Sequence, residues 1–491
     1  MVHFLSKLYK MTSKYSYWTL TKFITPLAFT VVAQDVGEQA LNRSLASSTN
    51  AVVELASFGI ALKIIQLFTG AIEDFKFVSV VLLKCQRDRK KILFCAGLFT
   101  IFSLAILLII GFSSAGIVII NDFHDVSNDV GAKARKLLYL FSLYPFIDAM
   151  SWIHVGILLK YKHSFWCGLA SISDVIAQVV FVLILLQTNL KYENTLYIPL
   201  IAAYSGVLAR LTILLIAYYK YVHHLVPQQI EEVDEEAKVV TICEVYKLWA
   251  PFMLIRVVQK ISRPMINLFV ARDRLDGLTR EDGLKSLAAL TVIWPISSMP
   301  CKWLSEVRVL EAAFTKKADE NRMISIRQIR IFGVGTCVFS LSIMLTLFWI
   351  PGLSTKLLMN VSNVDVGLAS LCVLPLKILT FLPIPTINRA IGTGWFLRIK
   401  KTSLLYPSGF FRLIIIVTLL FVLPRVGLHG ATMGSVALFS GFLADSVMIL
   451  LAAGYVKLQR ARTKRDESKE SIMLSKELDY PNQVIYKETY I

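Results

Sequence analysis

Long apolar blocks constrain the fold of this chain more than any other feature. Stretches such as Ile92–Ile120, Ile172–Leu186 and Ile331–Ile350 contain little polar interruption. About 20 largely apolar residues cross a bilayer as an α-helix, which satisfies its own backbone hydrogen bonds in lipid. The chain is 55% hydrophobic, compared with roughly 45–50% in soluble domains. The sequence therefore predicts an all-α membrane protein.

About twelve candidate transmembrane helices can be placed on this length criterion, and we expect two six-helix bundles. Their centres lie near residues 26, 63, 103, 148, 176, 207, 258, 298, 340, 380, 412 and 443. The segment Met1–Tyr17 is basic and polar, and no small-residue cleavage site follows it. We therefore expect the first span to act as its own uncleaved signal.

The basic residues gather in connections that follow even-numbered spans. The net charge is +18, and the basic runs include Lys84–Lys91, Lys160–Lys162, Arg398–Lys401 and the residues from Lys457 onward. Connections rich in Lys and Arg stay on the cytoplasmic side. The pattern predicts both termini in the cytoplasm of a cell-membrane protein. It also explains the positive charge without a nucleic-acid partner.

The expected organisation has five parts. They are a cytoplasmic N-terminal segment (1–17), an N-lobe (18–225), an acidic linker (226–242), a C-lobe (243–457) and a flexible cytoplasmic tail (458–491). The linker contains the run Glu231–Glu236, and blocks of like charge usually stay solvated.

The two halves repeat each other. At a shift of about 225 positions, Pro26 falls on Pro251 and Gln34 falls on Gln259. At a slightly larger shift, Pro145 matches Pro375 in the tenth span. An even number of spans in each half makes the repeat parallel, and transporters of this kind bind their substrate between the lobes near mid-membrane.

Charges inside the spans are sorted by half. The first half carries mainly acidic residues, namely Asp35, Glu38, Glu54, Asp148 and Asp174. The second half carries mainly basic residues, namely Arg256, Lys260, Arg263, Lys302, Lys377 and Arg412. A charge at mid-membrane costs at least about 2.5–3.5 kcal/mol, so these residues should face a wet cavity or each other.

We predict that the basic set binds an anion and that the acidic set couples or gates its movement. Arg256, Lys260 and Arg263 lie at i, i+4 and i+7, which places them on one face of a helix. Arg forks match carboxylate and phosphate groups. The alternative is that opposite charges only lock the two lobes together, with Asp35 and Glu38 paired with Lys260 and Arg263.

Other motifs add little. We find no nucleotide-binding, zinc-protease or serine-hydrolase motif, and we expect neither an enzyme nor a cofactor or metal. Asn360 opens a glycosylation sequon in an expected outer loop. The C-terminal Thr489-Tyr490-Ile491 fits strand addition to a PDZ domain.

Several runs resemble the progressive ankylosis protein family. They are Asp35–Arg43 (DVGEQALNR), Ser171–Val182 (SISDVIAQVVFV), Ile261–Asp273 (ISRPMINLFVARD) and Leu428–Gly434 (LHGATMG). The resemblance extends from about Trp18 to Val456. It implies the fold of the multidrug/oligosaccharidyl-lipid/polysaccharide flippases. It also implies a plasma-membrane exporter associated with pyrophosphate, ATP and citrate-like carboxylates, and with restraint of mineralisation. The tail of the family is strongly acidic, whereas the tail of this chain begins basic. This difference suggests a paralogue within the family.

The expected function is therefore outward transport of small polyanions by alternating access of two lobes. Two alternatives stay open at this point. One is a lipid flippase of the same architecture, which would need apolar cavity walls near the first and eighth spans. The other is a membrane scaffold or regulator that acts through its cytoplasmic tails.

Overall fold

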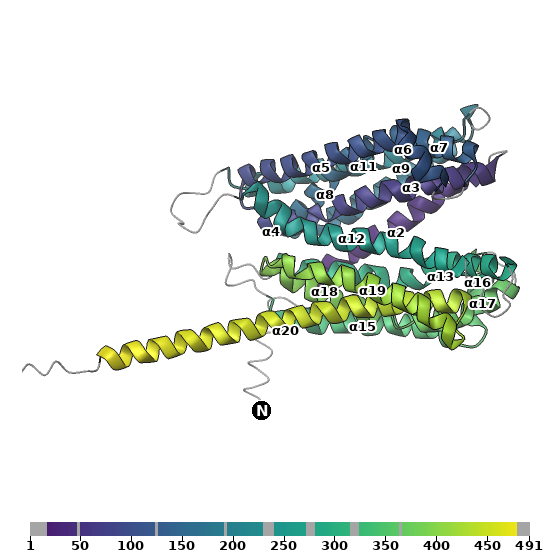
Figure 1. Cartoon of the computed structure of the whole chain (residues 1–491). Coiled ribbons are helices and arrows are strands. Elements are labelled where there is room, and N and C mark those ends of the chain that lie inside the picture. Colours follow the sequence, from purple (N-terminus) through teal and green to yellow (C-terminus); the bar gives the residue numbers. More distant parts are fainter. Residues whose placement is uncertain are drawn as a thin grey trace, which may run out of the picture.

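The computed structural model describes residues 17–46, 50–122, 126–190, 194–228, 240–271, 280–314, 324–362 and 366–478. Within these residues all the regular structure is helical, and the helices form two bundles that lie one above the other in Figure 1. The all-helical, two-lobed prediction is confirmed. Thr489-Tyr490-Ile491 and the acidic run of the linker lie outside the described residues.

The N-lobe comprises the elements up to Leu225. They are α2 (Tyr17–Ala46), α3 (Ala51–Glu73), α4 (Phe75–Leu82), α5 (Gln86–Phe112), α6 (Ser114–Ile117), η1 (Val118–Asp122), α7 (Asn128–Leu140), α8 (Tyr144–Lys160), α9 (Ser164–Leu185), α11 (Tyr197–Ala217), η2 (Tyr218–Val222) and η3 (His223–Leu225).

The C-lobe comprises the elements from Ile242. They are α12 (Ile242–Ala271), α13 (Arg280–Lys302), η5 (Trp303–Val307), α14 (Arg308–Phe314), α15 (Ile326–Trp349), α16 (Leu353–Ser362), α17 (Val366–Leu379), α18 (Pro383–Arg398), η6 (Thr402–Leu405), α19 (Tyr406–Val422), η7 (Leu423–Val426) and α20 (Gly430–Leu478).

Seven described helices or helix combinations are long and apolar enough to cross a membrane, and two bent pairs raise the number to nine. The helices α2, α12 and α13 are not among them, since each contains internal proline and several charges. Every predicted span centre except residue 380 falls inside a helix. Residue 380 lies at the bend between α17 and α18.

The structure corrects the register of the internal repeat. The pair α7 and α8 is bent by 49°, and the pair α17 and α18 is bent by 42°. Pro145 lies in the first turn of α8, and Pro383 begins α18. Pro145 therefore corresponds to Pro383 and not to Pro375, which lies inside α17. The sequence comparison was wrong here because both prolines fall in apolar surroundings close together.

Two backbone details support this corrected register. Lys162 follows α8 and Lys400 follows α18, and both have a positive φ, 65° and 56°. A glycine lies six residues before each lysine, and each glycine packs closely against the backbone of another helix in its own lobe. A Cβ on Gly156 would lie 2.2 Å from the Lys76 carbonyl oxygen, and a Cβ on Gly394 would lie 2.7 Å from the Arg308 carbonyl oxygen.

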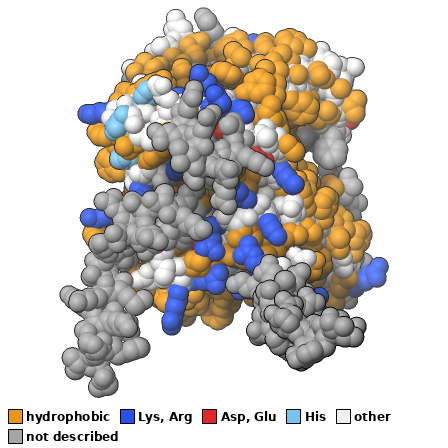
Figure 2. Space-filling view, turned by 90° about the vertical axis from the view of Figure 1, so that its left-hand side faces the viewer, with side chains coloured by type: hydrophobic (Ala, Val, Ile, Leu, Met, Phe, Trp, Pro, Cys, Tyr) orange, Lys and Arg blue, Asp and Glu red, His pale blue; other side chains and the backbone are white. Residues whose placement is uncertain are grey.

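The lobes share a core only toward one end of the molecule. This end, which we call the basic end, carries Lys84–Lys91, Lys160–Lys162 and Arg398–Lys401, and Figure 2 shows its Lys and Arg side chains. One hydrophobic core contains residues of both lobes. Its N-lobe residues, for example Phe23, come from the parts of the helices that lie at this end. A second core toward the opposite end consists of N-lobe residues alone.

The last helix extends further than expected. Helix α20 continues to Leu478 and projects beyond the bundle (Figure 1). The segment from 458 to 478, which we expected to be flexible, is therefore helical. Its sequence contains no Gly or Pro and is rich in Lys, Arg, Glu and Leu, which are strong helix formers.

Candidate functional site

A band of buried ion pairs joins the two lobes, and we call it the lobe clasp. It consists of Glu73 and Asp74 where α3 meets α4, Lys76 in α4, Arg256 in α12 and Glu306 in η5. The Arg256 guanidinium lies 3.1 Å from Glu73 and 2.6 Å from Asp74. The Lys76 ammonium lies 3.1 Å from Glu73 and 3.0 Å from Glu306. Acids and bases of both lobes therefore alternate across the interface.

Aromatic rings of the two lobes pack against each other beside the lobe clasp. The rings of Phe75 and Trp249 stack with centroids 4.9 Å apart, and the Trp249 indole N–H donates to the Ala71 carbonyl at 2.8 Å. The Phe23 and Phe314 rings meet edge to face with centroids 5.1 Å apart. Water is excluded from these contacts, which strengthens the ion pairs beside them. The structure is thus closed at the basic end.

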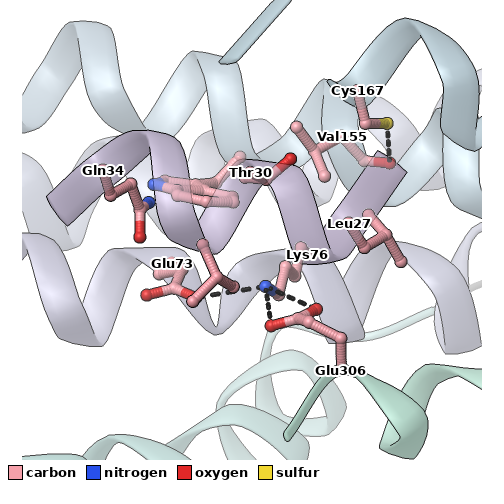
Figure 3. Close-up of a pocket in the computed structure, with 10 residues that line it drawn as sticks. Leu27, Thr30, Gln34, Glu73, Lys76, Val155, Cys167 and Glu306 are labelled. Carbon is pink, nitrogen blue, oxygen red and sulfur yellow. Dashed lines mark hydrogen bonds and ion pairs between the residues drawn. The ribbon is translucent and has the colours of Figure 1, made fainter. Parts of the chain in front are cut away.

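A small cavity lies beside the clasp (Figure 3). Lys76 points between the carboxylates of Glu73 and Glu306, while Gln34 approaches from α2 and Cys167 from α9. Nine of the ten residues that line this cavity belong to the N-lobe, and Glu306 is the contribution of the C-lobe. Charged and amide groups share the lining with apolar side chains.

The basic stripe on α12 lies as predicted on one helix, but its three members have different surroundings. Arg256 is neutralised in the clasp. Lys260 faces the other lobe, because a Cβ on Gly70 of α3 would lie 3.8 Å from Lys260 Cε. No carboxylate with a described side chain lies within 4.0 Å of the Lys260 ammonium. Arg263 is exposed and stacks on Trp294 at 3.9 Å from the ring centre.

The acidic partner predicted for this stripe binds elsewhere. Glu38 accepts from Lys63 at 3.0 Å and from Gln66 at 3.1 Å, and both belong to its own lobe. Asp35 lies in α2, but its side chain is outside the described part of the chain. The lobes are therefore not joined by Glu38 and Arg263, which was one form of the locking alternative.

Three other predicted residues lie apart from the clasp. Glu54 lies in the first turn of α3, and its Oε2 atom is buried without a hydrogen bond. Lys302 ends α13 with an exposed side chain. Lys377 in α17 approaches the ring of Trp349, with 5.7 Å between the ammonium and the ring centre. The structure does not bring Lys302 and Lys377 together with Lys260.

A second cluster lies inside the N-lobe. Arg210 of α11 forms a salt bridge with Asp148 of α8 and lies 3.5 Å from Asp174 of α9. Asp174 also accepts from Gln178 at 2.7 Å. Gly206 makes room for this contact, because a Cβ there would lie 2.2 Å from Asp174 Oδ1. The predicted residues Asp148 and Asp174 thus meet, around an arginine.

A third cluster lies inside the C-lobe, and its charges are reversed. Asp445 of α20 is fully buried and lies 3.2 Å from Arg389 of α18. Arg412 of α19 is 1% exposed and covers the ring of Phe442 at 4.1 Å. The amide of Gln259 on α12 faces Arg389 at 2.5 Å. The single carboxylate of this cluster pairs with Arg389 and lies more than 4.0 Å from the guanidinium nitrogens of Arg412.

Sequence reasoning missed most of the lobe clasp. Glu73, Asp74, Lys76 and Glu306 were not among the predicted site residues, although the run Glu73–Lys76 places three charges within an apolar span. That density was itself a usable signal. It was overlooked because such a run also fits the polar end of a membrane helix.

The two lobes have the fold of a class of membrane transporters. A transporter of the multidrug/oligosaccharidyl-lipid/polysaccharide superfamily from Pyrococcus furiosus has a TM-score of 0.63 at 14% identity, covering 90% of this chain and 96% of that one. That transporter has a binding pocket of reverse polarity. The Vibrio cholerae MATE transporter VcmN has a TM-score of 0.65 at 12% identity, covering 91% and 97%.

A third similar structure is an outward-facing multidrug resistance MATE transporter, with a TM-score of 0.60 at 14% identity and coverage of 91% and 96%. The family described as Progressive ankylosis protein (ANKH) matches residues 8–350. The chain therefore belongs to the progressive ankylosis protein family, as its sequence runs indicated.

Proposed function

We propose that this protein exports small polyanions across the plasma membrane by alternating access of its two lobes. The cargo would be pyrophosphate, ATP and other nucleotides, and citrate-like carboxylates, and export would regulate extracellular pyrophosphate and mineralisation. In this proposal the basic end and both termini face the cytoplasm. The closed clasp then separates the cytoplasm from a path that receives or releases cargo on the other side.

The observation that carries the proposal is Lys260. It faces the opposite lobe one helical turn beyond Arg256, and no described carboxylate lies within 4.0 Å of its ammonium group. The charges around it are mainly positive, those of Arg256, Arg263 and Lys63, while the carboxylates of Glu73 and Glu38 act on it from beyond 4.0 Å. A cation with surplus positive charge around it, between low-dielectric walls, attracts anions. Arg263 adds a fork that suits phosphate or carboxylate groups.

The N-lobe cluster suits a coupling role. Two carboxylates share one guanidinium, which leaves a surplus negative charge in a buried place. Uptake of a proton by Asp148 or Asp174 would neutralise that surplus. We propose that this uptake is linked to the rocking of the lobes, with Glu38 and Glu54 as gating residues nearer the opposite end.

A lipid flippase of the same fold is less well supported. Its path would need apolar walls near the first and eighth spans. The cavity beside the clasp has a mixed lining, in which Gln34, Lys76 and Glu306 lie next to apolar residues such as Leu27 and Val31. Burying these charged and amide groups against lipid tails would be costly.

The proposal is tested by efflux of pyrophosphate, ATP and citrate from cells that express the protein. Lys260→Gln and Arg263→Ala should each lower the efflux by about tenfold or more, since a charge-assisted contact contributes about 1.5–3 kcal/mol. Lys401→Gln, which removes an exposed charge at the basic end, is the control and should transport normally. Normal efflux from Lys260→Gln at equal surface abundance would contradict the assignment.

A further inference from the structure

The two buried clusters are charge-reversed counterparts in the repeat. Asp174 lies twelve residues after Lys162, and Arg412 lies twelve residues after Lys400, the two lysines with matching positive φ. Arg210 and Asp445 lie in the last span of their respective lobes. The N-lobe thus holds an arginine between two acids, where the C-lobe holds an acid beside two arginines.

The surplus charge of each cluster is neutralised in a different way. A surplus carboxylate becomes neutral when it takes up a proton. A surplus guanidinium has no such route, because arginine stays protonated at every pH that a protein experiences. The C-lobe cluster therefore needs an anion from outside the chain for full compensation. Without one, a charge would be buried at a cost of several kcal/mol.

Arg412 is the residue that lacks a partner. Its side chain is 1% exposed, and its Nε and Nη1 atoms make no hydrogen bond. Within the described residues, no carboxylate lies within 4.0 Å of its guanidinium nitrogens. Arg210, its opposite in charge pattern, has two carboxylates within that distance. The two N–H groups of Arg412 form one side of an anion site.

The site suits a small anion. The ring of Phe442 covers one face of the Arg412 guanidinium. A Cβ on the neighbouring Gly441 would lie 2.6 Å from Ile416 Cδ1 and 3.4 Å from Arg412 Cγ, so the surroundings are tightly packed. A polyanion such as pyrophosphate would also bring more charge than the single surplus cation compensates.

We propose that the C-lobe binds one monovalent inorganic anion, of the chloride class, at Arg412 beside the Arg389–Asp445 pair. This site is separate from the path of the transported polyanion. The anion holds α18, α19 and α20 together and makes the C-lobe cluster electrically neutral, as a proton does for the N-lobe cluster.

Thermal unfolding of the purified full chain tests the site. Sodium chloride should raise the melting temperature by a few degrees in a saturable manner, relative to sodium gluconate of equal ionic strength. Arg412→Gln should lose this chloride-dependent rise. Arg398→Gln, a partly exposed arginine at the basic end, should keep it. No rise in the wild type, or an equal rise in Arg412→Gln, overturns the proposal.

A second variant moves the result in the opposite direction and covers the case in which Arg412→Gln does not fold. Asp445→Asn removes the carboxylate that competes with chloride for the guanidinium groups, so half of the temperature rise should occur at a lower chloride concentration. An unchanged or higher concentration overturns the site. Pyrophosphate should leave the chloride titration unchanged. Displacement by pyrophosphate would show that the site belongs to the cargo path.

Discussion

At the scale of residues, neighbouring charges on one helix serve different purposes. Arg256 is bound by Glu73 and Asp74 of the opposite lobe, whereas Lys260, one turn further along α12, has no described carboxylate within 4.0 Å. The difference comes from α3, because its acidic C-terminal end at Glu73 meets Arg256, whereas the part of the helix beside Lys260 carries Gly70. Arg256, which is bound in the clasp, and Lys260, the candidate binding residue, therefore differ because of their positions along the partner helix and not because of their residue types.

The sequence predicted the stripe on α12 but not this division. The i, i+4, i+7 spacing fixes which residues share a face. It does not indicate how far the partner helix extends or where its acidic residues stop. For the same reason Glu38 could be aligned with Arg263, although its actual partner is Lys63 in its own lobe. Partners across an interface depend on tertiary packing, which one sequence leaves open.

Loss of Glu306 should open the basic end. Glu306 and Lys76 are both buried, so Glu306→Gln leaves a buried ammonium with only Glu73, and breaking such a pair costs about 3–5 kcal/mol. Cys167 lines the cavity beside this pair and reports on access. In a Cys243→Ser background, a membrane-impermeant maleimide added at the basic end should alkylate Cys167 about tenfold faster in Glu306→Gln.

The control for this experiment is Lys63→Gln. It also breaks an ion pair, but Lys63 and Glu38 belong to one lobe. Its Cys167 should stay as protected as in the wild type. Equal protection of Cys167 in Glu306→Gln would mean that the clasp does not hold the basic end closed.

At the scale of elements, most of the fold follows from apolar length and proline position. The predicted span centres fall in helices because apolar blocks of that length must be helical in a membrane. The counterpart of Pro145 in the repeat was assigned wrongly, since Pro375 is accommodated inside α17 while Pro383 begins the next helix. A proline removes one backbone hydrogen bond of its helix. Whether the span bends there depends on how the neighbouring helices pack around the backbone group that is left free.

Close packing between elements gives a prediction about glycine. Gly156 of α8 lies against the backbone of α4, where a Cβ would be 2.2 Å from the Lys76 carbonyl oxygen. Gly156→Ala should therefore force the two helices apart and destabilise the protein by about 1–3 kcal/mol. The measurement is the melting temperature of the purified protein.

Gly97 provides the matched comparison. It lies within α5, and a Cβ there would meet nothing within 4 Å. Gly97→Ala should be neutral or stabilise by about 0.5–1 kcal/mol, because alanine favours a helix interior. A destabilisation of equal size in both variants would show that close approach to α4 is not the reason for Gly156.

At the scale of the whole molecule, transport requires the lobes to separate at the basic end. Phe23 and Phe314 meet there across the interface, with ring centroids 5.1 Å apart. A short cleavable cross-linker between Phe23→Cys and Phe314→Cys should stop efflux, and cleavage should restore it. Cross-linking Phe58→Cys to Phe141→Cys, a ring pair 6.5 Å apart within the N-lobe, should leave efflux unchanged. Persistent efflux from the inter-lobe cross-link would contradict rocking of the lobes.

The reversed clusters have a consequence for electrophysiology. A parallel repeat places corresponding residues at the same depth in the bilayer. The surplus of one sign in the N-lobe and the surplus of the other sign in the C-lobe therefore cancel in any motion along the membrane normal. The empty carrier then has almost no gating charge from these groups. Its sensitivity to membrane voltage is set by the other charges inside the spans, such as Lys260, and by the valence of whatever it carries.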